Sequence, residues 1–263
     1  MLRALFTAAT GATTQQFHMD VIANNVANVN TVGYKKSRAE FQDLINQTLS
    51  SAGSLGTQGT RDPIGVQVGL GAKVSATQRD FITGPIMQTA NSLDLAVQGD
   101  GFFQVQLDSG ETAYTRDGSL KRDANGALVT SDGYPIIPNL TIPQDTAEVL
   151  INSAGTVSVK NGQGNIQELG QIQVARFANT SGMEAIGKNL YLKTPASGDP
   201  IVGTAGQGEF GRTTIAQGFL ENSNVQIVEE LINLITAQRA FEANSNVMKA
   251  GDQMLTTVNR IVS

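Results

Sequence analysis

The chain has 263 residues and a mass of 27.7 kDa, enough to bury the core of one large domain or two ordinary ones. It contains no cysteine and a single histidine, which excludes disulfides, thiolate nucleophiles, cysteine-based zinc or iron–sulfur sites and histidine clusters. Its formal net charge of −5 leaves no basic surface for a phosphate backbone, so nucleic acid is not expected as a partner.

No segment is expected to insert into a membrane or to be removed as a signal peptide. A transmembrane helix needs about 18 consecutive apolar residues, and no stretch approaches that length. The apolar run that follows Arg3 breaks at Thr7 and again at Thr10, which is too short for the core of a signal peptide. If the protein leaves the cytoplasm, we expect an export route that keeps the N-terminus.

The first segment, residues 2–28, has the spacing of a coiled-coil helix. Its seam positions recur at intervals of three and four: Leu2, Leu5, Ala9, Ala12, Gln16, Met19, Ala23 and Val26. Arg3 and Asp20 are its only charged residues, and a helix with one face in water carries more, so we expect neighbours on several sides. His18 lies off the seam and is interpreted as an exposed or subunit-contacting residue, because no second histidine could complete a metal site.

A Gly-rich stretch, residues 47–71, follows the first helix. It contains six glycines and only Arg61 and Asp62 as charges, which is typical of a flexible linker. Its second half alternates apolar residues at Ile64, Val66 and Val68, which favours an extended segment packed against a neighbouring subunit. Both interpretations stay open from the sequence.

In the middle of the chain the apolar period changes to two, which predicts strands. The alternating residues are Leu93, Leu95, Val97, Phe103, Val105, Leu107, Val157, Val159, Ile172, Val174, Leu190 and Leu192. Four Asx-Gly pairs, beginning at Asp100, Asp117, Asn125 and Asp132, are suited to tight turns because both residue types tolerate positive φ. We expect short antiparallel strands here with a core of their own.

No motif in the chain supports catalysis or cofactor binding. Residues 182–188 match a phosphate-binding loop up to the lysine, but Asn189 replaces the magnesium-binding hydroxyl and no helix follows. Asp123 and Asn125 could begin a calcium loop, but Ala127 stands where a third oxygen ligand is needed, so a turn is expected. We expect no catalytic residue, no cofactor and no metal.

The C-terminal segment predicts a second coiled-coil helix. Residues 223–226 fit a capping box, and Glu229 and Glu230 follow where carboxylates favour a helix N-terminus. Apolar residues then recur every seven positions: Ile227, Leu234, Phe241, Met248, Leu255 and Val262. The second core position becomes polar after Leu231, through Gln238, Ser245, Asp252 and Asn259, a pattern that fixes register and partner number. The alternative is two ordinary amphipathic helices that cover a globular core.

The predicted fold class is therefore α+β, with a discontinuous terminal-helix coiled-coil domain, in which the N- and C-terminal helices pair, and a central antiparallel β domain. The expected boundaries are residues 1–34 with 219–263 for the helical domain, 35–75 for the extended connecting segment and 76–218 for the β domain.

Three stretches resemble the bacterial flagellar rod and hook proteins. Residues 23–35, with Asn24-Asn25, Asn28 and then Thr31-Val32-Gly33-Tyr34-Lys35, resemble the N-terminal signature of that family. Residues 93–118, with Val97-Gln98-Gly99-Asp100-Gly101-Phe102-Phe103, look like its β domain, and residues 221–245 look like its C-terminal helix. The resemblance covers essentially the whole chain, and length and details are most similar to members that form the distal rod, with proximal-rod and hook paralogues as alternatives.

The resemblance implies a structural subunit of the basal body that polymerises helically into a rigid drive shaft, transmitting torque from the motor to the hook. It implies contacts with other rod proteins, with the hook protein and with the peptidoglycan-ring and outer-membrane-ring bushings. It further implies delivery by the flagellar type III export apparatus, without a cleaved signal peptide, to the periplasm-spanning rod.

The seams and the resemblance together nominate two sets of residues. Asn-Asn-x-x-Asn would supply amides for hydrogen bonds between subunits, Gly33 would let the chain leave the helix, and Lys35 would begin an outward segment. The expected subunit interface is Leu5, Ala12, Met19, Asn24, Asn25, Val26, Asn28, Thr31, Gly33, Tyr34, Leu234, Gln238, Phe241, Asn244, Met248 and Leu255. A rod-stiffening segment, implied by the resemblance alone, contains Gly56, Pro63, Gly65, Gly69 and Gly71.

Two other classes of protein remain as alternatives. A secreted β-rich adhesin or carbohydrate-binding module with helical ends predicts glycan binding and a small closed oligomer. An exported hydrolase that uses carboxylates of the β domain predicts a cleft and an activity that is lost on a single Asp or Glu substitution.

Overall fold

The computed structural model describes residues 2–50 and 64–262 and divides the chain into two compact units. The helical unit contains Met1–Val26, Ser37–Gln78 and Gln226–Ser263, and the β unit contains Ala27–Lys36 and Arg79–Val225. Residues 35–75 were expected to form a connecting segment of their own. The described residues of 37–78 belong to the helical unit, and Gly71 lies against Thr10 and Phe41 against His18 of the N-terminal helix.

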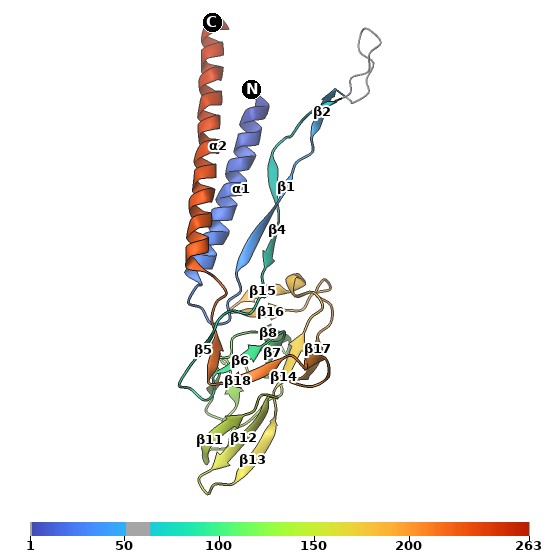
Figure 1. Ribbon diagram of the computed structural model, residues 1–263, viewed down its shortest axis with the longest axis vertical. Helices are drawn as coiled ribbons and strands as arrows, with labels where there is room; N and C mark the ends of the chain where they lie inside the picture. The colour runs from blue at the N-terminus through green and yellow to red at the C-terminus, as the bar shows by residue number, and fades with distance from the viewer. Residues whose placement is uncertain (1, 51–63, 263) are drawn as a thin grey trace. The chain divides into compact units, whose positions relative to one another are not determined.

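Two long helices form the body of the helical unit. Helices α1 (Leu2–Ala27) and α2 (Ile227–Val262) lie side by side and run antiparallel (Figure 1). A two-stranded ribbon extends from the same unit, in which β1 (Ser37–Asp43) pairs with β4 (Ala72–Arg79) and β2 (Gln47–Ser50) pairs with β3 (Val66–Val68). The pairing of the terminal helices is thus confirmed.

Helix α2 begins later than the capping box predicted. Its first residue is Ile227, and the Ser223 hydroxyl accepts a hydrogen bond from the Val225 N–H (3.3 Å) in a local turn before the helix. Glu229 and Glu230 in the first turn and Arg260 in the last turn complement the helix dipole. Glu229 and Glu230 therefore indicate the start of the helix correctly, and the Ser223 hydroxyl belongs to the turn that precedes the helix.

The β unit is built on a six-stranded sheet in the order β15-β16-β8-β7-β14-β17. A three-stranded sheet, β11-β12-β13 (Figure 1), and the pairs β18-β6, β19-β5 and β10-β9 complete it. Every pairing within this unit whose register is defined is antiparallel. The bounds are β5 (Ile86–Gln88), β6 (Leu95–Gln98), β7 (Phe102–Gln106), β8 (Thr112–Thr115), β9 (Lys121–Arg122), β10 (Leu128–Val129), β11 (Thr146–Ile151), β12 (Thr156–Asn161), β13 (Ile166–Gln171), β14 (Gln173–Arg176), β15 (Glu184–Gly187), β16 (Leu190–Leu192), β17 (Ile201–Thr204), β18 (Thr214–Gln217) and β19 (Phe219–Glu221), with 3₁₀ turns at Thr180–Gly182 and Gly208–Phe210.

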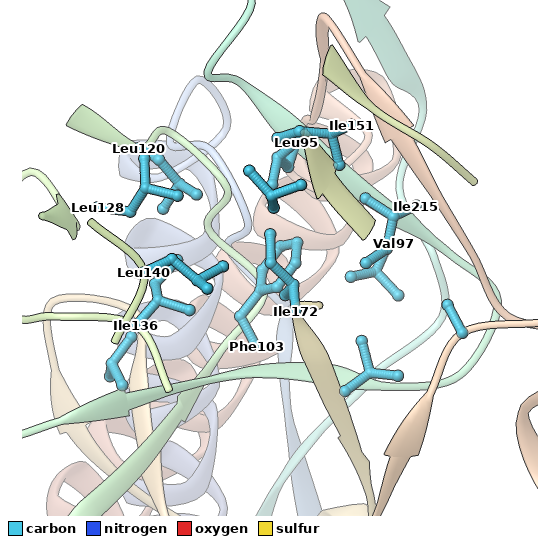
Figure 2. Close-up of a cluster of buried hydrophobic side chains, with 14 of the residues drawn as sticks. Leu95, Val97, Phe103, Leu120, Leu128, Ile136, Leu140, Ile151, Ile172 and Ile215 are labelled. Carbon is cyan, nitrogen blue, oxygen red and sulfur yellow. The ribbon is translucent and has the colours of Figure 1, made fainter. Parts of the chain in front are cut away.

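The alternating residues of the strands form the core of the β unit. Figure 2 shows Phe103 and Ile172 at its centre, with Val97 and Ile215 on one side and Leu140 on the other. Because successive side chains of a strand point to opposite faces, the predicted period of two brings these residues inward. The predicted α+β class with a central antiparallel β region is confirmed.

Two of the four Asx-Gly pairs, Asn125-Gly126 and Asp132-Gly133, lie in tight turns. Gly126 and Gly133 adopt positive φ, as predicted. Gly118 does not, and a Cβ placed there would collide with the backbone carbonyl oxygen of Leu95. Here glycine is required because another strand approaches closely.

Candidate assembly surfaces

The contact between α1 and α2 is a close antiparallel seam. A Cβ built on Gly251 would lie 2.6 Å from Leu5 Cδ2, and one built on Gly11 would lie 3.0 Å from Asn244 Nδ2. Near the other end of the pair Asn25 Nδ2 donates to Glu230 Oε2 at 3.4 Å. Glycines at two levels of the seam let the helices approach more closely than larger side chains would allow.

One row of each predicted seam is buried or half-buried within the chain, and the other row is displaced. The predicted interface residues that are buried or half-buried in the two helices are Leu5, Ala12, Met19, Asn25, Val26, Leu234, Phe241, Asn244, Met248 and Leu255. The second row lies one residue earlier than predicted, at Ile22 in place of Ala23 and at Ala237 in place of Gln238. Gln238 is exposed and Ser245 is half-buried within the single chain. That this polar row fixes register and partner number stays a prediction.

The other side of α1 contacts the β1–β4 ribbon. Asn25 Nδ2 donates to the Ser37 carbonyl at 2.8 Å, and Ser37 N–H donates back to Asn25 Oδ1 at 2.9 Å. The His18 ring meets Phe41 edge-on, with 5.6 Å between ring centroids. Asn25, nominated for a bond between subunits, thus has its amide engaged within its own chain, and α1 has neighbours on two sides.

Three of the nominated stiffening residues lie in or beside this ribbon. Gly65 precedes β3, and Gly69 and Gly71 connect β3 to β4. Gly71 has φ +113, and a Cβ there would collide with the Thr10 hydroxyl, so glycine lets the ribbon lie directly against α1. Gly56 and Pro63 lie outside the described residues.

The signature that follows α1 forms a tight exit from the helix. Thr31 Oγ1 donates to Asn28 Oδ1 at 3.2 Å, and Gly33 adopts φ +70. Gly33 N–H donates to the Glu221 carbonyl at 2.8 Å, and a Cβ on Gly33 would lie 2.7 Å from the Asp117 nitrogen. The segment that leaves α1 is therefore bonded directly to the strand that leads into α2.

A buried ionic cluster, Lys35–Glu221–Arg116, lies at this exit. Glu221 Oε1 accepts from Lys35 Nζ at 2.6 Å and from the Gly84 N–H at 2.8 Å, and Oε2 accepts from Arg116 Nη1 at 3.2 Å. The relative exposures of Lys35, Glu221 and Arg116 are 0%, 1% and 2%. Lys35 also donates to the Ile82 carbonyl at 2.8 Å.

Burial dominates the electrostatics of this cluster. It lowers the pKa of Lys35 and the pKa of Arg116, and in both cases the Glu221 carboxylate opposes the shift. Lys35 was expected to begin an outward segment. The Lys35 side chain turns inward to the carboxylate of the cluster, and the course of the chain as an outward segment in the assembly stays a prediction. No sequence rule pairs charges that are 186 and 105 residues apart, so sequence reasoning missed the cluster.

Large apolar side chains remain exposed on both helices. On α2, Val228, Leu231, Ile232 and Ile235 follow the spacing i, i+3, i+4, i+7, and their exposures range from 45% to 72%. This row lies on the side of α2 away from Leu234 and the α1 contact. On α1, Leu2 and Phe6 are 66% and 68% exposed. Such rows are typical of helices that meet further partners.

Neither a metal-binding cluster nor a membrane-spanning helix is found among the described residues. Among them there is no group of three or more Asp, Glu or His side chains that could hold a metal ion. None of the helices in that part of the chain is long and apolar enough to cross a membrane. Residues 182–188, which match a phosphate-binding loop up to the lysine, run from the 3₁₀ turn at Thr180–Gly182 into β15, and no helix follows them to receive phosphates.

Comparison with known proteins identifies similar chains. Residues 5–35 match the family Flagella basal body rod protein, residues 96–159 match the Flagellar hook protein FlgE/F/G D1 domain, and residues 216–261 match the Flagellar basal body rod FlgEFG protein C-terminal family.

Full-length relatives are found in several bacteria. Flagellar basal-body rod protein FlgG of Borreliella burgdorferi is 48% identical over 99% of both chains. FlgG of Caulobacter vibrioides is 47% identical over 100% of both chains, and FlgG of Bacillus subtilis is 39% identical over 97% of both. A solved structure, the Helicobacter pylori flagellar hook protein FlgE2, covers 71% of this chain and 43% of its own, with a TM-score of 0.25 and 14% identity.

Proposed function

This chain belongs to the flagellar basal-body rod protein family and is a structural subunit of the rod, not an enzyme, and from this premise we propose how copies of it build the distal rod. They polymerise helically into a rigid shaft that transmits torque from the motor to the hook. Similarity to FlgG proteins along the whole chain supports the distal rod over its proximal-rod and hook paralogues.

The observation that carries the proposal is the exposed apolar row of α2. The β unit has its own closed core, so this row is not needed to fold it. Four exposed aliphatic side chains on successive turns are unfavourable in water, and burying them against another subunit lowers the free energy by about 25 cal/mol per Å² of apolar surface. Helices with such a row on the face away from their own partner suit the inner wall of a tube.

The predicted interface residues divide between two roles in this proposal. Ala12, Asn25, Gly33 and Tyr34 are buried within their own chain and position the helices. Asn24 and Gln238 are exposed and face other subunits. The remaining residues of the set are half-buried and serve both the seam of one chain and the contact between chains.

The β1–β4 ribbon is the stiffening element of the proposed rod. A two-stranded ribbon is at best marginally stable alone in water. Ile45, Leu49, Ile64 and Val66 are all exposed on the ribbon and its connections, which supports a neighbouring subunit as the cover. Gly65, Gly69 and Gly71 let this segment follow α1 and its neighbours closely.

The proposed location determines the remaining partners. The polymer meets other rod proteins and the hook at its ends, and the peptidoglycan-ring and outer-membrane-ring bushings along its side, in the periplasm-spanning part of the basal body. The type III export apparatus delivers the chain without cleavage. Leu5, Ala8 and Ala12 belong to the helix seam, and a cleavage that removed α1 would remove its half of that contact. This supports delivery of the chain with its N-terminal helix in place.

Electron microscopy of the concentrated, purified chain tests the proposal. We expect straight tubes, and we expect Ile232→Asp combined with Ile235→Asp to abolish them. Ile166→Asp, at a 66% exposed isoleucine of β13, is the matched control and should leave the tubes intact. Small closed rings that bind glycans would instead support the adhesin alternative and contradict the rod.

A further inference from the structure

The two ends of the α1–α2 pair carry opposite charge. Because Leu5 lies level with Gly251, Gly11 with Asn244 and Asn25 with Glu230, the pair has a tip end, residues 2–12 with 243–262, and a root end, residues 13–26 with 227–242. The charged residues of the two helices at the root end are Asp20, Glu229, Glu230, Arg239 and Glu242, a formal charge of −3. Those at the tip end are Arg3, Lys249, Asp252 and Arg260, a formal charge of +2.

Each end also carries exposed apolar side chains. The root end has the α2 row of Val228, Leu231, Ile232 and Ile235, which begins beside Glu229. The tip end has Leu2 and Phe6 on α1, and Arg3 lies between them in the sequence. Each end therefore combines exposed apolar side chains with a net charge, which is negative at the root and positive at the tip.

We propose that the tip of one copy docks on the root of the next, with Leu2 and Phe6 against Leu231 and Ile232 and with Arg3 beside Glu229. This inference rests on the proposed function and names the contact that propagates the polymer. The occupant is a second copy of this chain, because both halves of a charge-complementary surface are present on one molecule.

The charge pattern also determines the symmetry of the contact. Two tips would bring positive ends together and two roots would bring negative ends together, so an isologous dimer through either surface is disfavoured. A tip-to-root contact is heterologous: each copy keeps a free tip and a free root after docking. Such a contact grows into an open helical assembly unless its rotation closes a ring.

The absence of cysteine from the sequence makes disulfide trapping a direct test. Phe6→Cys and Ile232→Cys are made as separate variants, mixed in equal amounts under polymerising conditions and oxidised. We expect dimers cross-linked between the two variants, and none from either variant alone. Asn246→Cys, exposed on the same side of α2 about three turns from the root row, is the matched control and should not cross-link to Phe6→Cys.

The outcomes separate this inference from the proposed function. Tubes of the parent chain together with cross-links of Phe6→Cys to itself, or equally to Asn246→Cys, would overturn the tip-to-root contact and leave the rod intact. Failure of the parent chain to form tubes would overturn the rod and this contact with it. If Phe6→Cys impairs assembly, Leu2→Cys mixed with Leu231→Cys gives the same readout. An absence of mixed dimers from both pairs, in preparations that do form tubes, would refute the contact.

Discussion

Glu221 is the only anion of its buried cluster, so its loss should be more harmful than the loss of either cation. Glu221→Gln keeps the shape of the side chain and removes the charge. The amide then offers one acceptor oxygen where the carboxylate accepts from Lys35, Gly84 and Arg116. Its NH₂ group must face a donor, so at least one buried cation loses its partner.

The magnitude follows from which charges stay buried. Removing one member of a buried ion pair costs about 3–5 kcal/mol because the other charge is left uncompensated. Lys35→Met removes a cation and leaves Glu221 and Arg116 paired one to one, and the Ile82 carbonyl still accepts from Asn224 Nδ2 at 3.2 Å. We therefore expect a loss of only about 1–2 kcal/mol for Lys35→Met.

Urea unfolding followed by circular dichroism measures both variants and their combination. We expect Lys35→Met to destabilise the parent protein and to stabilise the Glu221→Gln background, since in that background it removes an unpaired charge. This reversal of sign is the signature of the cluster. Additive effects, or a smaller loss for Glu221→Gln than for Lys35→Met, would refute the assignment of Glu221 as the shared partner.

Two further predictions concern backbone fit and alkaline stability. Gly33→Ala should lower the free energy of unfolding by about 2–3 kcal/mol, because φ is +70 and a Cβ would meet the Asp117 nitrogen. Gly162→Ala, where nothing lies within 4 Å of the added Cβ, is the control and should change that free energy little. Equal effects of the two substitutions in thermal unfolding would contradict the argument. Burial raises the pKa of Tyr191 above its usual 10.0, so the contribution of the neutral phenol to stability should be complete below pH 10 and disappear as the pH rises through the raised pKa. The loss of stability at alkaline pH should be weaker in Tyr191→Phe. An unchanged pH dependence of unfolding in that variant would contradict this prediction.

The strands of the β unit could be predicted because their signal is local. Val97, Phe103 and Val157 alternate with residues of the opposite face, and a shift by one residue would turn every core side chain outward. Asx-Gly pairs then mark the turns between strands. Both signals depend on residues within about ten positions of one another, so one sequence is sufficient to find them.

The helix seams show where local signals fail. Ala8 and Ala9 are equally apolar, and periodicity alone does not distinguish which of them faces α2. In α2 the predicted row that contains Leu234 and Phe241 is half-buried, but Ala237 and Gly251, small residues that the apolar period does not select, are buried. The exposed row is formed by large apolar side chains on the opposite side of the helix.

The buried cluster connects these observations to the function of a shaft. Its residues come from the segment that leaves α1, from the end of β8 and from the strand that enters α2, and the Gly33–Glu221 backbone bond joins the first and last of these. Apolar contacts are non-directional and tolerate sliding. A carboxylate that accepts from three donors has one geometry, so a relative shift of the two segments breaks several charge-assisted bonds at once. Within the β unit the cluster therefore fixes the segment that follows α1 against the strand that precedes α2, a geometry that suits the proposed role in a rigid rod.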